Sequence, residues 1–200
     1  MCCLFGLIDY NNTFTAKEKN RLIKILSTEC EARGTDATGI AFNTENGLHI
    51  SKRPVAAHKM WYRIPDSSKV VMGHTRMTTQ GSEKFNFNNH PFPGHVDKMN
   101  FALAHNGVLH NDSELRITEC LPKTNIQTDS YVAVQLIEKE NTLNFDSIKK
   151  MAEKTEGSFC YTILDDKTTY SSLKVIILWL FTNLMGSIFM QARTRFLRER

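Results

Sequence analysis

Short apolar runs alternate with polar segments along the first 166 residues, in a pattern typical of strands mixed with a few helices. Apolar runs predict strands over residues 2–9, 38–43, 48–52, 70–75, 100–105 and 158–164. Apolar positions recur at helical spacing over residues 15–32, 130–138 and 148–153. Strands therefore occur early and late, with helices between and beside them, which predicts an α+β domain with helices packed against antiparallel sheets.

Two local signals support these elements. Thr15 and Glu18 have the spacing of a capping box at the start of the first predicted helix. Asn46-Gly47 lies between the second and third apolar runs and predicts a hairpin turn. Two hundred residues with 41% apolar and 23% charged content suit one globular domain with a substantial core.

The charge of the chain is unevenly distributed. The formal net charge of +4 comes from residues 168–200, because the basic and acidic side chains of residues 1–167 cancel. We therefore expect no nucleic-acid partner. The five cysteines have scattered spacings that indicate neither a zinc ribbon nor a disulfide framework. Because no secretory leader opens the chain, a reducing cytoplasm is the expected compartment.

Cys2 is a candidate nucleophile. Removal of Met1 would place a thiol and a free α-amino group on one residue, and the amine could accept the thiol proton near neutral pH. The alternative interpretation is that Cys2 begins an ordinary buried strand. The segments that follow favour the catalytic interpretation.

Two polar loops come next along the chain. Arg33 and Asp36 flank Gly34 and can hold a loop together, either as a salt-bridged turn or as support for a site. Arg76 follows a predicted strand, and its planar guanidinium matches an amino-acid α-carboxylate, although a lone arginine at a strand end is also a common surface residue.

Two later segments offer complementary groups. The Asn106 amide and the Gly107 N–H could form an oxyanion hole, or the pair could make a simple hairpin turn. Asp129 could cap the following helix or bind a substrate ammonium group. His90, in a Pro-containing loop, is expected to order that loop. The histidine spacings do not fit a zinc site, and we expect no metal.

Taken in order, these segments resemble the class II glutamine amidotransferases, whose glutaminase domains have the N-terminal-nucleophile (Ntn) fold. The resemblance covers about residues 2–166. It rests on the Cys2 start followed by the motifs R-G-x-D-x-x-G, G-H-T-R-W-A-T-H-G or close variants, H-P, H-N-G and (S/T)-D, matched at residues 33–39, 73–81, 90–91, 105–107 and 128–129.

This resemblance implies a four-layer αββα sandwich and a glutaminase that converts glutamine to glutamate and ammonia through a cysteine thioester, without a cofactor. It implies that Cys2 is the nucleophile and that Asn106 and Gly107 form the oxyanion hole. It further implies that substrate is bound by Arg76, Thr79 and Asp129, with Arg33, Asp36 and His90 in supporting positions.

The chain departs from the family pattern at three positions. Met77 and Gln80 stand where the family often has Trp and His, and Cys3 replaces a frequent Gly. No synthase domain follows, so we expect the ammonia acceptor on a separate subunit. Two other functions stay open: an Ntn hydrolase of another amide, which Arg76 and Asp129 disfavour, and a degenerate non-catalytic subunit, which retention of Met1 would favour.

Residues 167–200 differ from the rest of the chain. They are mainly apolar from 173 to 190 and end in a cluster of arginines. A membrane anchor is one alternative, which the polar interruptions and the short length of the run disfavour, and a plain buried helix is another. We favour a shifted reading frame: one base added at the codon of Lys167 lets the tail read with the closing strand patterns of the family. The domain would then be incomplete at its C-terminus.

Overall fold

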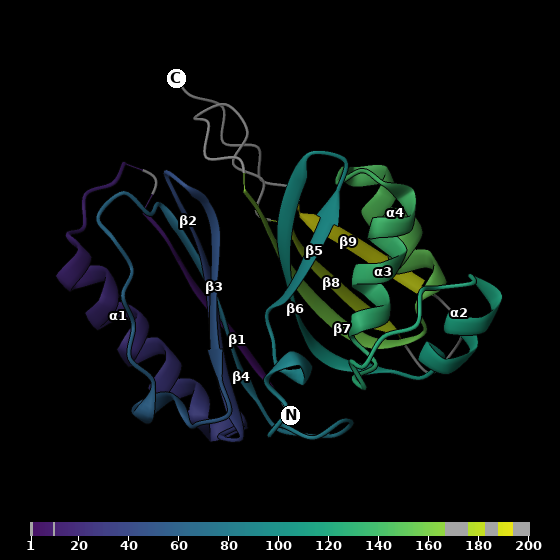
Figure 1. Ribbon diagram of the computed structural model, residues 1–200, viewed down its shortest axis with the longest axis horizontal. Helices are drawn as coiled ribbons and strands as arrows, with labels where there is room; N and C mark the ends of the chain where they lie inside the picture. Colours follow the sequence, from purple (N-terminus) through teal and green to yellow (C-terminus); the bar gives the residue numbers. More distant parts are fainter. Residues whose placement is uncertain (1, 10, 167–175, 183–187, 194–200) are drawn as a thin grey trace.

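The computed structural model describes residues 2–9, 11–166, 176–182 and 188–193, the last two ranges as backbone only (Figure 1). Two antiparallel sheets form the centre of the molecule. The first has the order β1 (Cys3–Ile8), β4 (Val70–Arg76), β2 (Ala37–Thr44), β3 (Gly47–Arg53). The second has the order β5 (Phe92–Val96), β6 (Met99–Leu109), β7 (Gly157–Asp165), β8 (Ile176–Thr182), β9 (Ile188–Arg193).

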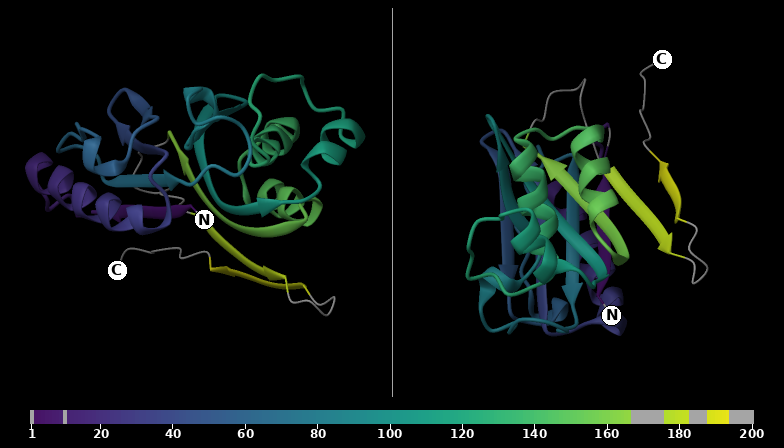
Figure 2. Two further views of the ribbon diagram at one scale, coloured as in Figure 1. Left: turned by 90° about the horizontal axis from the view of Figure 1, so that it is seen from below. Right: turned by 90° about the vertical axis from the view of Figure 1, so that its right-hand side faces the viewer.

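Helices cover the outer faces of both sheets (Figures 1 and 2). The helix α1 (Ala16–Glu29) packs on the first sheet, and α3 (Tyr131–Glu140) and α4 (Phe145–Lys154) lie on the second. The short helix α2 (Asp112–Thr118) lies beside α3. Single turns of 3₁₀ helix occur as η1 (Cys30–Arg33), η2 (Ala57–Lys59) and η3 (Asn86–Asn88). The expected αββα layering is confirmed.

Three apolar clusters hold these layers together. Ala41 and Met72 of the first sheet meet Ala102 and Ala104 of the second between the two sheets. A second cluster joins α1 to the outer face of the first sheet, and the largest joins α3 and α4 to the second sheet. Burial of apolar surface in three parallel interfaces fixes the order of the layers.

The predicted strands and helices all occur, with shifted ends. The strand predicted over residues 100–105 extends to Leu109, and the helix predicted from residue 148 begins at Phe145. Two elements were not predicted from the sequence: β5, because Pro93 and Gly94 interrupt its apolar residues, and α2, which is only 7 residues long.

The helix α1 buries an unexpected face. The predicted capping box is present, with Thr15 and Glu18 exchanging hydrogen bonds. However, its buried residues are Lys19, Ile23 and Ser27, whereas Ile25 and Leu26 stay 49% and 38% exposed.

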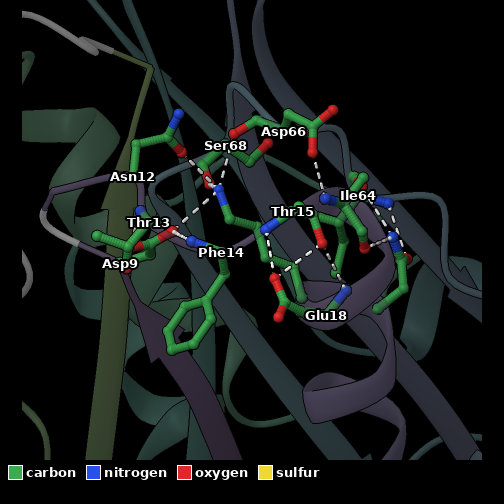
Figure 3. A network of polar contacts seen from close by, with 12 residues as sticks. Asp9, Asn12, Thr13, Phe14, Thr15, Glu18, Ile64, Asp66 and Ser68 are labelled. Carbon is green, nitrogen blue, oxygen red and sulfur yellow. Dashed lines mark hydrogen bonds and ion pairs between the residues drawn. The ribbon is translucent and has the colours of Figure 1, made fainter.

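The Lys19 amine explains this choice of face. It donates to Asn12 Oδ1 at 2.6 Å and to the carbonyl oxygens of Asp66 and Ser68, each at 2.7 Å, and lies 3.2 Å from Asp9 Oδ2 (Figure 3). A buried ammonium is tolerated when it is both paired and hydrogen-bonded. The turn between β1 and α1 is therefore organised around one buried charge.

The tail beyond Asp166 continues the second sheet. β8 pairs antiparallel with β7, and β9 with β8. These segments are strands and not the helix that one alternative required, while residues 167–175, 183–187 and 194–200 of the atypical tail lie outside the described residues. No described helix is long and apolar enough to cross a bilayer.

Candidate active site

Cys2 lies just before β1, against the end of β4. Its sulfur accepts the Met77 N–H at 3.4 Å and lies 3.5 Å from the Met77 carbonyl oxygen. Burial raises the pKa of the Cys2 thiol because it disfavours the thiolate, while the Met77 N–H and the Arg76 charge act in the opposite direction. A Cys2 nucleophile here therefore requires a nearby base.

The loop at residues 33–36 fastens Cys2 to the end of β4. Arg33 Nε donates to the Cys2 carbonyl oxygen at 3.1 Å. Asp36 donates its N–H to the Arg76 carbonyl oxygen at 3.0 Å and accepts the Thr78 N–H at 2.7 Å. A Cβ on Gly34 would stand 2.5 Å from the Arg76 carbonyl carbon, so this approach requires glycine.

Arg76 is 3% exposed, which excludes the surface-arginine alternative. Its guanidinium donates to Asn89 Oδ1 at 2.6 Å, to the Gln80 carbonyl oxygen at 2.6 Å and to that of Gly81 at 2.9 Å. These bonds hold the loop after β4, on which Thr79 is exposed. The Nε–H and one Nη1–H have no partner among the described residues, which leaves donors for a ligand.

Asn106 and Gly107 lie inside β6, opposite Cys160 and Phe159 of β7, and not in a hairpin turn. Gly107 has φ 153°, and a Cβ there would stand 1.8 Å from the Ser158 carbonyl oxygen. Only glycine fits this position. The half-buried Asn106 amide has no hydrogen-bond partner within the described residues.

Asp129 is buried beside the end of β6. Its carboxylate accepts the Leu109 N–H at 2.7 Å and the Ser130 hydroxyl at 3.2 Å. Ser130 occupies the N-cap position of α3 without a side-chain capping bond, and the Asp129 carboxylate bonds to β6. The Arg76 charge lowers the pKa of the Cys2 thiol and the Asp129 charge raises it, so charges of opposite sign act on one thiol.

Three buried histidines connect the two sheets behind this site. The His90 ring lies between those of His74 and Phe92, with centroids 4.2 and 4.4 Å away. His74 Nε2 lies 3.0 Å from the His105 carbonyl oxygen, and His105 Nδ1 lies 2.7 Å from Ser130 Oγ. Burial lowers the pKa of His74 to about 3 and that of His105 to about 4, and lowers the pKa of His90 well below its usual value.

His90 is thus buried between two aromatic rings in the core, and its role in ordering the loop stays a prediction. His74 and His105 were assigned no role from the sequence, although each is a member of a recognised motif. The same is true of Lys52, which belongs to no recognised motif and whose amine donates to the Asn89 carbonyl oxygen at 2.6 Å. Burial, with the Arg76 charge, lowers the pKa of Lys52 to about 8. In the described part of the chain, no group of three or more His, Cys, Asp or Glu side chains could hold a metal ion.

Comparison with known proteins identifies related sequences and folds. The glutamine–fructose-6-phosphate aminotransferase of Halalkalibacterium halodurans is 34% identical over 171 residues, which are 82% of this chain and 27% of that protein. The chain thus spans about a quarter of that relative's length. No protein-family model matches the chain.

Two solved structures share the fold. The allosteric regulatory enzyme of purine biosynthesis superimposes with a TM-score of 0.69 at 18% identity, covering 90% of this chain and 37% of that one. The glutamine phosphoribosylpyrophosphate amidotransferase of B. subtilis gives a TM-score of 0.62 at 19% identity, covering 95% of this chain and 41% of that one.

Proposed function

Since the chain carries a glutaminase domain of the class II glutamine amidotransferase type, we propose that it hydrolyses the side-chain amide of glutamine to glutamate and ammonia through Cys2. We assign the domain to residues 2–166. The observation that carries the proposal is the charge around the Cys2 thiol, whose pKa is raised mainly by burial, lowered by the Arg76 guanidinium and raised further by the Asp129 carboxylate. A free amino acid such as glutamine has complementary charges.

The base in this proposal is the α-amino group that removal of Met1 would expose on Cys2. Burial disfavours the Cys2 thiolate, so the attacking sulfur must lose its proton as the reaction proceeds. An α-amino group titrates at about pH 7.7–8.0 and can accept that proton. The same amine then protonates the departing ammonia.

Asn106 and Gly107 would stabilise the tetrahedral intermediate. The unpartnered Asn106 amide offers N–H donors, and the unusual backbone of Gly107 can direct its own N–H toward the same oxygen. Collapse of the intermediate releases ammonia and leaves a γ-glutamyl thioester on Cys2. Water then hydrolyses this thioester to glutamate and restores the thiol.

Substrate binding would use the two charged residues. Arg76 would bind the α-carboxylate through its remaining donors, with Thr79 on the adjacent loop. Asp129 would bind the α-ammonium group. Arg33, Asp36 and His90 would support these residues by holding the Cys2 carbonyl, the Thr78 N–H and the core behind the site.

The acceptor of the ammonia differs among the named relatives, one of which aminates fructose 6-phosphate and another phosphoribosylpyrophosphate. We propose that a synthase partner supplies the acceptor for this chain. The scattered cysteines and the absence of a disulfide framework support a cytoplasmic enzyme.

The test measures glutamate and ammonia release from glutamine, together with the intact mass of the chain. We expect loss of Met1 and measurable hydrolysis, reduced to background in Cys2→Ala. Cys120→Ser removes an exposed cysteine and should keep full activity.

Two outcomes would contradict the proposal. Better turnover of amides that lack the α-amino or α-carboxyl group would favour a different Ntn hydrolase. A folded chain that retains Met1 and does not hydrolyse glutamine would favour a non-catalytic subunit.

A further inference from the structure

A second pair of thiols lies directly beside Cys2. Cys3 Sγ and Cys30 Sγ are 2.7 Å apart, with Cys3 on β1 and Cys30 at the start of η1. A disulfide requires a separation of about 2.05 Å, so only a small side-chain rotation separates this pair from bonding distance. We propose that Cys3 and Cys30 form a reversible disulfide that joins the strand after Cys2 to η1.

The surrounding contacts hold the two cysteines in register. The Thr75 hydroxyl on β4 donates to the Cys30 carbonyl oxygen at 3.1 Å, and Cys3 is paired with Thr75 in the sheet. Arg33, the last residue of η1, donates to the Cys2 carbonyl oxygen at 3.1 Å. Both ends of η1 are therefore hydrogen-bonded to residues of the β1–β4 pair, which keeps Cys30 beside Cys3.

The order of reaction follows from the environments of the two sulfurs. Burial and the contact with Cys3 raise the pKa of Cys30 to about 12, so Cys30 keeps its proton at neutral pH. Cys3 is thus the first sulfur to react. Once Cys3 is modified, its contribution to the raised pKa of Cys30 is lost while that of burial remains, so Cys30 acts only in the second step.

The oxidant in this proposal is a small-molecule disulfide of the glutathione class. The Cys3 thiolate attacks one sulfur of that disulfide, its S–S bond breaks, and one small thiolate leaves and takes up a proton. Cys30 then loses its proton and attacks Cys3 Sγ, and the second small thiol leaves. In total, two protein thiols are oxidised and one small disulfide is reduced to two thiols.

The crosslink leaves the Cys2 thiol free. It would fix η1, and with it Arg33, against the residue that carries the proposed nucleophile, so its relevance to catalysis rests on the proposed function. We expect the oxidised chain to keep its glutaminase activity and to unfold at a higher temperature, because a crosslink restricts the unfolded chain.

The crosslink is tested by peptide mass mapping of the Cys2→Ala chain. This substitution removes the neighbouring thiol of Cys2. The full chain is reduced, equilibrated at neutral pH with increasing ratios of oxidised to reduced glutathione, quenched in acid and alkylated. We expect a crosslinked pair of peptides containing Cys3 and Cys30, loss of both alkylation sites, and reversal by excess thiol. Cys120→Ser in the same background should leave the crosslink intact, and Cys30→Ser should abolish it.

Two results would overturn the proposal. The first result is a chain in which the exposed Cys120 is modified but Cys3 and Cys30 are not crosslinked. They would then carry separate glutathione adducts or both be alkylated. The other is the same distribution of pairings in the folded chain and in denaturant. Because the crosslink is read by mass in a chain without Cys2, its absence is distinguishable from a failure to hydrolyse glutamine.

Discussion

Asn106 differs from Arg76 and Asp129 because its side chain has no hydrogen-bond partner among the described residues. Arg76 and Asp129 already brace the loop after β4 and the end of β6. Replacing either one would therefore alter local structure as well as substrate binding. Asn106 is the cleaner residue with which to test the chemistry of the site.

We expect Asn106→Ala to lower kcat by about 10²–10³-fold with little change in KM, because an oxyanion develops only in the transition state. The measurement is steady-state glutamine hydrolysis with the variant's fold checked by circular dichroism. Asn100→Ala, at the exposed end of the same strand, should change kcat by less than about twofold. A raised KM with unchanged kcat would instead assign Asn106 to ground-state binding.

The turn from β1 into α1 depends on a buried ion pair. Lys19 and Asp9 have side chains only 0% and 3% exposed, and their partners come from the turn itself and from residues 66–68. Removal of one partner leaves an uncompensated buried charge. The stability of this element is therefore concentrated in two residues.

We expect Asp9→Asn to reduce the free energy of unfolding by about 3 kcal/mol, since Lys19 would stay buried without its carboxylate. Urea denaturation measures this change. Glu140→Gln removes a surface partner of Lys150 and should cost less than about 1 kcal/mol. Equal effects of the two variants would show that the buried pair contributes no more than a surface pair.

The same pair predicts a pH dependence. Burial alone would raise the pKa of Asp9, but the N–H groups of Phe14 and Thr13 and the Lys19 amine outweigh it and lower the pKa to about 2. The unfolded value is about 3.9, so this stabilisation is present above about pH 4 and is lost as the pH falls through about 2. The difference in stability between the parent chain and Asp9→Asn should shrink over that range, and a constant difference would contradict the assignment.

At the scale of the whole molecule, the two sheets bring together segments that are far apart in the sequence. β1 and β4 carry Cys2 and Arg76 on one sheet, and β6 leads from Asn106 to the Asp129 carboxylate on the other. The contact from His74 to His105 joins the two sheets beside these residues. The site therefore depends on correct stacking of both sheets, and damage to either one would remove it.

We propose that residues 167–200 come from a shifted reading frame, which is a prediction about the second sheet as a whole. We expect the gene to contain a run of A at the codon of Lys167. Insertion of one A should give a chain that is more soluble and unfolds at a higher temperature, because family-like closing strands would then stand in the place of β8 and β9. Sequencing across this codon and expression of both frames test the prediction. A restored chain that is less soluble than the present one would contradict it.

Local sequence patterns determined most of the elements. Apolar runs predicted every strand before residue 166 except β5, and helical spacing predicted α1, α3 and α4. The capping box at Thr15 correctly marked the start of α1. The candidate residues were also recognisable, because a thiol, a guanidinium, an amide and a carboxylate have fixed chemistry wherever they stand. These properties belong to single residues and their near neighbours.

Only the tertiary structure decided which groups meet. It placed Asn106 within β6 and not in a turn, and it buried Lys19. It also paired the Asp129 carboxylate with the Leu109 N–H and not with a helix end. It also brought Cys3 to Cys30. The physical reason is that these contacts depend on strand register and on packing, which bring together residues distant in the sequence, 27 positions apart for Cys3 and Cys30 and 20 for Leu109 and Asp129. Local periodicity carries no information about such distances.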